Sequence, residues 1–154
     1  MANGTGLTPD EGDAWLAFVV SAMQVTTRLD RALHADHDLS LDDYGILAVL
    51  SRSPDGAVRF SDIAHTLRMP KANVTYRFQR MARRGLVERR SCASDGRGAF
   101  VVLTREGAAV FAAAQTPHLE RVRHMFVDPI EPDALPVLAR QLGHVLTALD
   151  RDDA

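Results

Sequence analysis

Residues 86–107 have the sequence LVERRSCASDGRGAFVVLTREG, and this stretch decides which fold the chain can adopt. Residues 86–91 and 99–103 are short segments that favour strands, and the ASDGRG segment between them is typical of a tight loop. We therefore predict a β-hairpin with Arg97 at its tip. Thr104 follows the second strand and is a suitable N-cap for a helix.

A basic helix is predicted directly before this hairpin. Pro70 suits the first turn of a helix, and Gly85 suits the left-handed residue that ends one. A helical wheel of residues 71–84 has an apolar edge of Val74, Phe78 and Met81, opposite a polar stripe of Asn73, Tyr76, Arg80 and Arg83. Ser61 is predicted to cap a short helix upstream. A short helix, a turn, a second helix and a hairpin are typical of a winged helix-turn-helix.

Four more helices are expected outside this region. Thr8, Pro9 and Glu11 predict a capped helix that ends near residue 35, and Ser40 with Asp43 predicts a second helix ending at the turn of residues 53–56. The helix after Thr104 is expected to be interrupted or kinked near Pro117, and a last helix follows the prolines at 129 and 132. The predicted fold is mainly α with a small β-hairpin wing, and 154 residues favour a single domain.

The positive charge of the chain is concentrated in one place. Residues 68–97 contain nine of the 18 Lys and Arg residues but only two acidic residues, which gives a local charge of +7. The other 124 residues hold nine basic and 18 acidic side chains, or −9, although the overall charge is only −2. A basic helix can be merely a solvated surface, but its place in a winged helix-turn-helix favours a polyanion, and above all DNA.

The basic region contains the candidate DNA-binding residues. The N-terminal half of the helix is expected to contact bases, and its C-terminal half phosphates. The predicted base contacts are Lys71, Asn73, Tyr76 and Arg77, and the predicted phosphate contacts are Arg80, Arg83 and Arg84; Thr75 is a further candidate DNA-binding residue. Arg97 at the wing tip is expected to enter the minor groove, with Asp95 as a candidate partner that orients it or as a simple turn residue.

The segments LVERR at 86–90, DGR at 95–97 and VLTREG at 102–107 resemble the MarR family of bacterial transcription regulators. The order of predicted elements is similar to that family over almost all of residues 1–154. The resemblance implies a homodimer, with dimerisation helices in residues 8–36 and 105–150 and a winged helix-turn-helix DNA-binding region in residues 40–104. It further implies a repressor of a pseudo-palindromic double-stranded DNA operator that a small aromatic or phenolic effector releases.

Two residues depart from the pattern of that family. Tyr76 follows Thr75 where many members have arginine, and Pro70 replaces a common serine. We therefore do not expect the operator sequences of relatives to apply to this chain.

Several other groups of residues suggest ligand sites. Trp15, Phe18, Tyr44 and Phe111 are candidates for an aromatic effector pocket, although apolar residues at helical spacing are more often core. The group His34, Asp36, His37, Asp38 and Asp42 is a weak candidate for a divalent metal, and a solvated polar loop is the favoured interpretation. His118 and His124 are expected on an exposed helical surface, with an anionic ligand as the alternative. Cys92 leaves a redox-responsive regulator as an alternative.

Other functional classes have little support. The chain lacks an apolar run of membrane-spanning length, its acidic N-terminus does not resemble a secretory signal, and a single cysteine fits the reducing cytoplasm. Nucleophile elbow, phosphate-binding glycine loop and HExxH motifs are missing, so we expect no enzyme activity and no cofactor. A metal-dependent hydrolase using His34 and His37 and a sequence-independent architectural nucleic-acid binder are the weaker alternatives.

Overall fold

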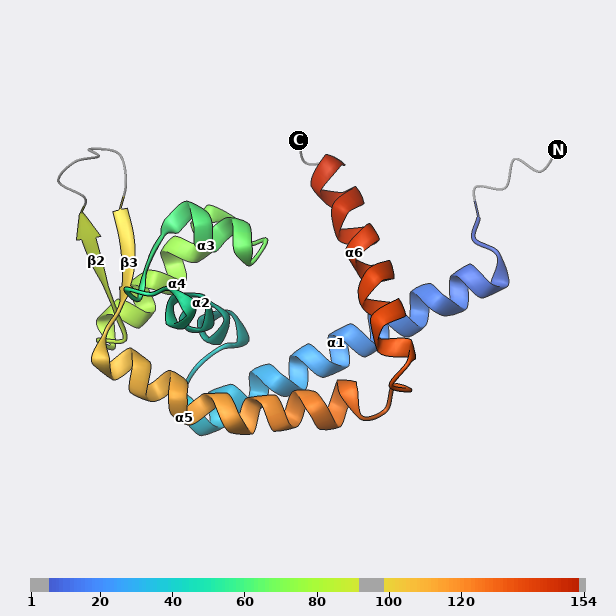
Figure 1. The fold of residues 1–154 in the computed structure, drawn as a ribbon, viewed down its shortest axis with the longest axis horizontal. Coiled ribbons are helices and arrows are strands. Elements are labelled where there is room, and N and C mark those ends of the chain that lie inside the picture. Colours follow the sequence, from blue (N-terminus) through green and yellow to red (C-terminus); the bar gives the residue numbers. More distant parts are fainter. Residues whose placement is uncertain (1–5, 92–98, 153–154) are drawn as a thin grey trace. The chain divides into compact units, whose positions relative to one another are not determined.

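The computed structural model describes residues 6–91 and 99–152, and these residues form a mainly helical fold with one small antiparallel sheet (Figure 1). The predicted fold class is therefore confirmed. The chain divides into two compact units, Met1–His118 and Leu119–Ala154. The first contains the helix-turn-helix, the sheet and the hydrophobic core.

Helix α1 (Pro9–His37) begins with the predicted capping box. The Glu11 amide donates to Thr8 Oγ1 at 3.3 Å, and the Thr8 amide donates to the Glu11 carboxylate at 2.7 Å. The hydrogen bond from the Thr8 backbone, followed by one from the Thr8 side chain, lowers the pKa of the Glu11 carboxyl below its ordinary value, because both stabilise the charged form. The helix ends at Asp38, which adopts a left-handed φ of 52°.

Helix α2 (Leu41–Arg52) also begins as predicted. Ser40 and Asp43 exchange reciprocal side chain–backbone hydrogen bonds of 3.0 Å, and both residues are buried. Asp30 of α1 accepts a 2.8 Å hydrogen bond from the Leu41 amide. The start of α2 is thus fixed by its own cap and by the preceding helix.

The helix-turn-helix is inserted between strands. Strand β1 (Ala57–Arg59) leads directly into α3 (Phe60–Thr66), and α4 (Lys71–Arg83) follows after a short turn. The prediction that Ser61 caps α3 is wrong, because the helix begins one residue before it and the N-cap is Arg59, without a side-chain cap bond. The Ser61 hydroxyl instead hydrogen-bonds Asp62 Oδ1 at 3.1 Å.

Strands β2 (Val87–Ser91) and β3 (Ala99–Leu103) form the predicted hairpin, and they run side by side in Figure 1. Strand β1 adds a third, unpredicted strand on the other side of β3, with Ala57 opposite Val102 and Arg59 opposite Phe100. The sheet order is β1-β3-β2. Pairing with β3 therefore fixes the start of α3 relative to the wing.

The connection from the hairpin to the next helix is tightly built. Gly85 ends α4 with φ of 71°, and Thr104 Oγ1 lies 2.7 Å from the Gly85 carbonyl and 3.0 Å from the amide of Gly107. Thr104 thus caps helix α5 (Arg105–Val122) as predicted. Gly107 lies against the Leu86 carbonyl, where a Cβ would collide with the backbone.

The predicted interruption at Pro117 is wrong, because α5 continues through it, whereas the alternative of a kink there stays a prediction. Proline removes one backbone donor, but Ala114 and His118 on either side are buried and hold the helix in place. A turn of wider π-helix, η1 (Arg123–Val127), follows α5, and α6 (Ala134–Asp152) begins after the prolines as expected.

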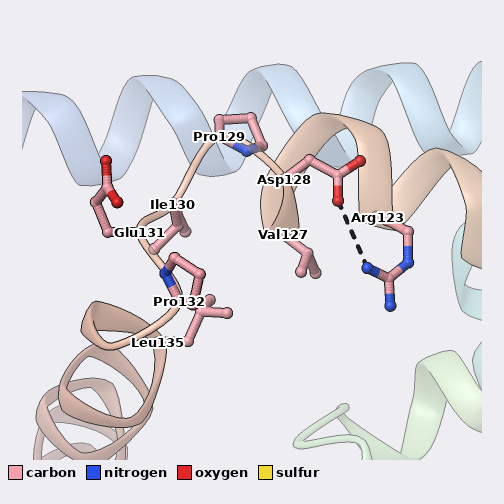
Figure 2. A pocket seen from close by; sticks show the side chains of 8 residues that line it. All are labelled: Arg123, Val127, Asp128, Pro129, Ile130, Glu131, Pro132 and Leu135. Carbon is pink, nitrogen blue, oxygen red and sulfur yellow. Dashed lines mark ion pairs between the residues drawn. The ribbon is translucent and has the colours of Figure 1, made fainter.

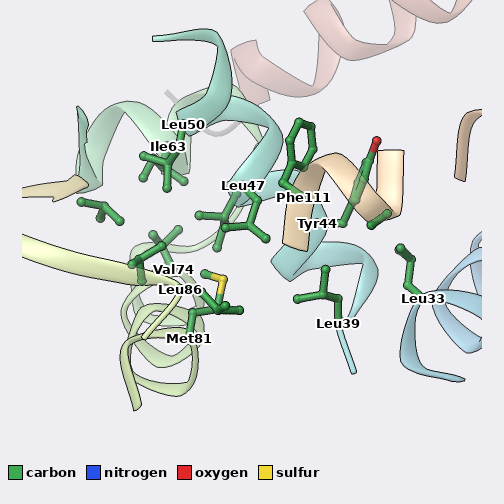
Figure 3. Close-up of a cluster of buried hydrophobic side chains, with 14 of the residues drawn as sticks. Leu33, Leu39, Tyr44, Leu47, Leu50, Ile63, Val74, Met81, Leu86 and Phe111 are labelled. Atoms are coloured by element: carbon green, nitrogen blue, oxygen red, sulfur yellow. The ribbon is translucent and has the colours of Figure 1, made fainter. Parts of the chain in front are cut away.

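The core of the first unit joins α1, α2, α3, α4, the sheet and α5 (Figure 3). Val74 and Met81 are each 1 % exposed and form the buried side of α4, as the helical wheel predicted. Tyr44 packs against Phe111, with ring centroids 5.3 Å apart, and against His118 at 4.1 Å. Burial raises the pKa of the Tyr44 phenol, and the charge of Arg52 opposes this in part. The expectation that His118 is exposed is wrong.

Candidate nucleic-acid interface

The outer face of α4 presents polar groups of several kinds. Asn73, Tyr76 and Arg83 are exposed, and Tyr76 keeps 56 % of its surface accessible. Arg80 is half-buried on the same side. Amide, phenol and guanidinium groups together can form hydrogen bonds with base edges and phosphates. The face opposite the core thus has the chemistry expected of a recognition helix.

Lys71 and Thr75 lie on the exposed surface at the start of α4. The Thr75 hydroxyl donates a 3.0 Å hydrogen bond to the Lys71 carbonyl within the helix. Its proton is therefore engaged, and the oxygen is available to an external partner mainly as an acceptor.

Arg77 differs from the predicted base contacts because its guanidinium is bound inside the protein. Its Nη2 lies 3.0 Å from Asp42 Oδ2, and its Nη1 donates to Ser40 Oγ at 3.0 Å. Asp43 Oδ1 lies 3.9 Å away. These partners are at the start of α2, so Arg77 forms a contact between α4 and α2, and its role as a base contact stays a prediction.

Arg84 is likewise engaged within the protein and not placed as a phosphate contact. Its guanidinium donates to the carbonyls of Asp38 and His37, the latter at 3.2 Å, and lies 3.5 Å from Asp38 Oδ2. The sequence predicted Arg77 as a base contact and Arg84 as a phosphate contact. The sequence did not show that acidic side chains 34 to 46 residues earlier in the chain, those of Asp38, Asp42 and Asp43, pair with these two arginines.

A basic pocket of about 470 Å³ lies beside α4. Its positively charged residues are Arg59, Lys71 and Arg89, and its polar residues include Ser61, Thr75 and Gln79. The Arg59 guanidinium lies over the Phe100 ring at 5.0 Å, and that of Arg89 lies 6.0 Å from the centre of the Phe60 ring. Such a pocket has the charge and donors to hold a phosphate group.

Sequence reasoning did not include Arg59, Arg89 or Gln79 in the site. Arg59 precedes the basic stretch, and only the β1–β3 pairing brings it to the wing. Arg89 was part of the basic stretch, but its position on a strand gave no sign that it faces α3 and α4. Alternation along a strand was the available signal, because it places Arg89 on the same face of β2 as the buried Val87.

The predicted wing tip falls outside the described residues. Arg97, Asp95 and Cys92 all belong to residues 92–98. Their predicted roles therefore stay predictions.

The four aromatic residues predicted for an effector pocket form two separate pairs. Trp15 and Phe18 are neighbours on the exposed part of α1, with ring centroids 6.3 Å apart, whereas Tyr44 and Phe111 belong to the core with Leu33. Along α1, Trp15 is about 27 Å from Leu33 at 1.5 Å per residue. Within one chain these four residues therefore do not line a single small-molecule pocket, and their role in an effector pocket stays a prediction.

A pocket in the second unit contains none of these aromatic residues. It has a volume of about 400 Å³ and lies between η1 and the start of α6 (Figure 2). Val127, Ile130 and Leu135 provide apolar walls, and Arg123 pairs with Asp128 at 3.5 Å at its edge. Both charged side chains are more than half exposed, so this ion pair contributes little.

The acidic and histidine side chains at the α1–α2 junction are engaged separately. His34 Nδ1 contacts Asp30 Oδ2 at 3.2 Å, Asp38 faces Arg84, and Asp42 faces Arg77. Within residues 6–91 and 99–152, no group of three or more His, Cys, Asp or Glu side chains is arranged to hold a metal ion. None of the helices in these same ranges is long and apolar enough to cross a membrane.

Comparison with known proteins identifies the family. The pattern of the MarR family matches residues 37–98, which include the helix-turn-helix and β2. AbsC, a MarR family transcriptional regulator from Streptomyces coelicolor, is 31 % identical, with a TM-score of 0.91 and coverage of 96 % of this chain and 99 % of that chain. Sco3205, a MarR family regulator from the same organism solved in complex with DNA, is 28 % identical, with a TM-score of 0.91 and 94 % coverage of each chain.

A curated relative agrees with this result. The homoprotocatechuate degradative operon repressor of Escherichia coli is 28 % identical over 134 residues, covering 87 % of this chain and 86 % of the relative. These relatives are regulators of transcription, and their similarity extends over both units of the chain. The chain therefore belongs to the MarR family of transcriptional regulators.

Proposed function

We propose that this protein is a sequence-specific, double-stranded DNA-binding repressor that acts as a homodimer and is released by a small molecule. The observation that supports this most is the exposed polar face of α4, with Asn73, Tyr76 and Arg83 opposite a buried apolar edge. Sco3205, which shares its fold and 28 % of its sequence, has been solved in complex with DNA. DNA binding also makes the cytoplasm its site of action.

The residues of α4 and the neighbouring pocket are proposed to have different roles. Asn73 and Tyr76 contact base edges in the major groove, and Arg80, Arg83 and the pocket residues Lys71, Arg59 and Arg89 contact phosphates. Arg97, at the tip of the wing, enters the minor groove, and Asp95 orients its guanidinium. Thr75 accepts a hydrogen bond at the helix surface. The proposed DNA-binding region is residues 40–104.

A homodimer is supported by apolar side chains that the single chain leaves exposed. They lie on α1 and α6, within the proposed dimerisation segments 8–36 and 105–150: Trp15, Leu16, Phe18, Val20, Met23, Val137, Val145, Leu146 and Leu149. Apolar surface of this extent usually marks an interface. A dimer also doubles the DNA footprint, since one recognition helix contacts only a few base pairs.

The effector is proposed to be a small aromatic or phenolic compound. One relative is named for a homoprotocatechuate degradative operon, so homoprotocatechuate is the first compound to test. Release is measured by titrating it into the complex of protein and fluorescent operator. An inert aromatic acid of the same charge is the control, and equal release by both compounds would contradict specific recognition.

The central test is selection of genomic DNA fragments by the purified protein, followed by sequencing. We expect pseudo-palindromic fragments whose half-sites are about one helical turn apart, including one near the protein's own gene. Replacement of Asn73 by alanine should change the preference at one base position by about 1–3 kcal/mol, whereas Arg83→Gln should weaken all sequences equally. Selection of fragments without any shared sequence would refute the proposal.

A further inference from the structure

Two arginines on α4 connect the recognition helix to the junction between α1 and α2. Arg77 and Arg84 are two helical turns apart and project from the same side of α4, about 10 Å from each other along its axis. Arg77 contacts the start of α2 through Asp42 and Ser40, and Arg84 contacts the last residues of α1. The contacts therefore hold α4 at its middle, through Arg77, and at its C-terminal end, through Arg84.

The junction that receives these arginines is itself rigid. Ser40 and Asp43 form the buried capping box of α2, and Asp30 of α1 accepts the hydrogen bond from the Leu41 amide at 2.8 Å. Asp38, at the end of α1, has a left-handed conformation and faces Arg84. Hydrogen bonds thus form a continuous path from α1 through the start of α2 to the recognition helix.

The geometry points to Arg77 and Arg84 as positioning residues that set the orientation of α4 relative to α1, and hence the spacing of the two recognition helices in the dimer. This inference rests on the proposed function, in which α1 lies in the dimer interface and α4 in the major groove. A residue in this role acts through the protein and makes no phosphate contact. Its loss changes how the dimer fits its operator without changing the number of phosphates that it neutralises.

The charge of Arg77 is matched to the groups around it. Asp43 is 1 % exposed, and a buried carboxylate requires a nearby positive charge. Arg77→Gln therefore risks loss of the fold. Asp42 is 44 % exposed in its side chain, so Asp42→Asn removes one partner of Arg77 while leaving the buried pair in place.

The test compares the operator affinity of Asp42→Asn, Arg77→Gln and the double variant with that of Arg83→Gln, an exposed arginine on the same helix. We expect Asp42→Asn and Arg77→Gln each to weaken operator binding about tenfold, and the double variant to be no weaker than Arg77→Gln. A phosphate-binding Arg77 predicts the opposite for Asp42→Asn, namely equal or tighter binding, because a negative charge beside the DNA is lost.

The salt dependence of binding gives a second readout. Arg83→Gln should reduce the slope of log affinity against log salt by about one, whereas Arg77→Gln should leave it unchanged. Arg84→Lys keeps the positive charge but loses the planar guanidinium group, whose two nitrogens donate to the carbonyls of Asp38 and His37. We expect it to lose operator affinity with an unchanged slope, and wild-type affinity for Arg84→Lys would overturn the role of Arg84.

The spacing of half-sites distinguishes positioning from general damage. Wild-type protein should discriminate strongly against an operator with one base pair inserted between its half-sites, and Asp42→Asn should discriminate less. Circular dichroism melting checks that each variant is folded. Unchanged discrimination in a folded Asp42→Asn variant with reduced affinity would overturn the inference.

A DNA-free measurement separates this inference from the proposed function. Amide hydrogen exchange of the free Asp42→Asn protein should be faster in residues 37–43 and 71–84, with little change in α5. If wild-type protein selects no operator, the proposed function fails. The exchange experiment uses no DNA, so it still tests whether the contacts of Arg77 and Arg84 hold α4. Unchanged exchange in both segments would show that these contacts do not hold α4.

Discussion

Replacement of Leu149 by alanine tests the proposed dimer. Leu149 belongs to the apolar stripe of α6, and 54 % of its surface is exposed in the single chain. The change removes three carbon groups, each worth about 0.8 kcal/mol when fully buried. Only the 54 % of the Leu149 surface that is exposed in the single chain can become buried in the dimer, so the binding free energy lost is about 1.3 kcal/mol per protomer. A two-fold interface contains the residue twice, so the dimer loses about 2.6 kcal/mol, equivalent to an increase of about 80-fold in the dimer Kd.

Sedimentation equilibrium over a range of protein concentrations measures this Kd directly. Arg140→Ala is the matched control, because Arg140 lies about 180° from Leu149 around α6 and is exposed. We expect its dimer Kd to equal that of the wild type. Thermal melting in the monomeric concentration range should be the same for both variants, since Leu149 lies outside the buried core. Equal dimer affinity of the two variants would refute the assignment of this stripe to the interface.

Three further predictions concern single positions. Gly107→Ala should destabilise the protein by about 1–3 kcal/mol in chemical unfolding because its Cβ would collide with the Leu86 carbonyl, whereas Gly12→Ala, with open space around it, should not. Arg89→Gln should reduce the salt slope of operator binding by about one, and an unchanged slope would exclude this pocket residue from phosphate contact. Because burial raises the pKa of Tyr44, the neutral phenol stabilises the fold below the ordinary tyrosine pKa near 10, and this contribution is lost as pH rises through the higher folded value. Tyr44→Phe should therefore lessen the alkaline loss of stability in pH-dependent melting, and an identical pH profile would contradict this.

Local signals predicted most of the helices because their causes lie within a few residues. The capping boxes of Thr8 with Glu11 and of Ser40 with Asp43 need only a spacing of three, and both are present. Strand β1 has three residues and depends on pairing with β3, more than 40 positions later. Nothing local to residues 57–59 indicates that partner, so the strand and the consequent N-cap of α3 at Arg59 were missed.

The same limit applies to the candidate site. Periodicity assigned Asn73, Tyr76 and Val74 to the correct faces of α4, since a helix places its own residues by geometry alone. It could not assign Arg77, because the groups that bind this arginine come from α2. A flanking position on a helical wheel can face either solvent or a neighbouring helix, and tertiary packing decides between them.

The arginines on α4 show why a count of local charge overstates DNA contact. Arg77 is neutralised by Asp42 and Asp43, and Arg84 by Asp38, so two of the cations in the basic stretch contribute little to the field that a phosphate experiences. The acidic groups involved, Asp38, Asp42 and Asp43, belong to the part of the chain outside residues 68–97, which carries the charge of −9. Freeing the two arginines would strengthen attraction to any DNA while loosening the orientation of α4. If the two arginines have the positioning role that we propose, nonspecific affinity would rise as specific affinity falls, and these three carboxylates would favour sequence discrimination over total affinity.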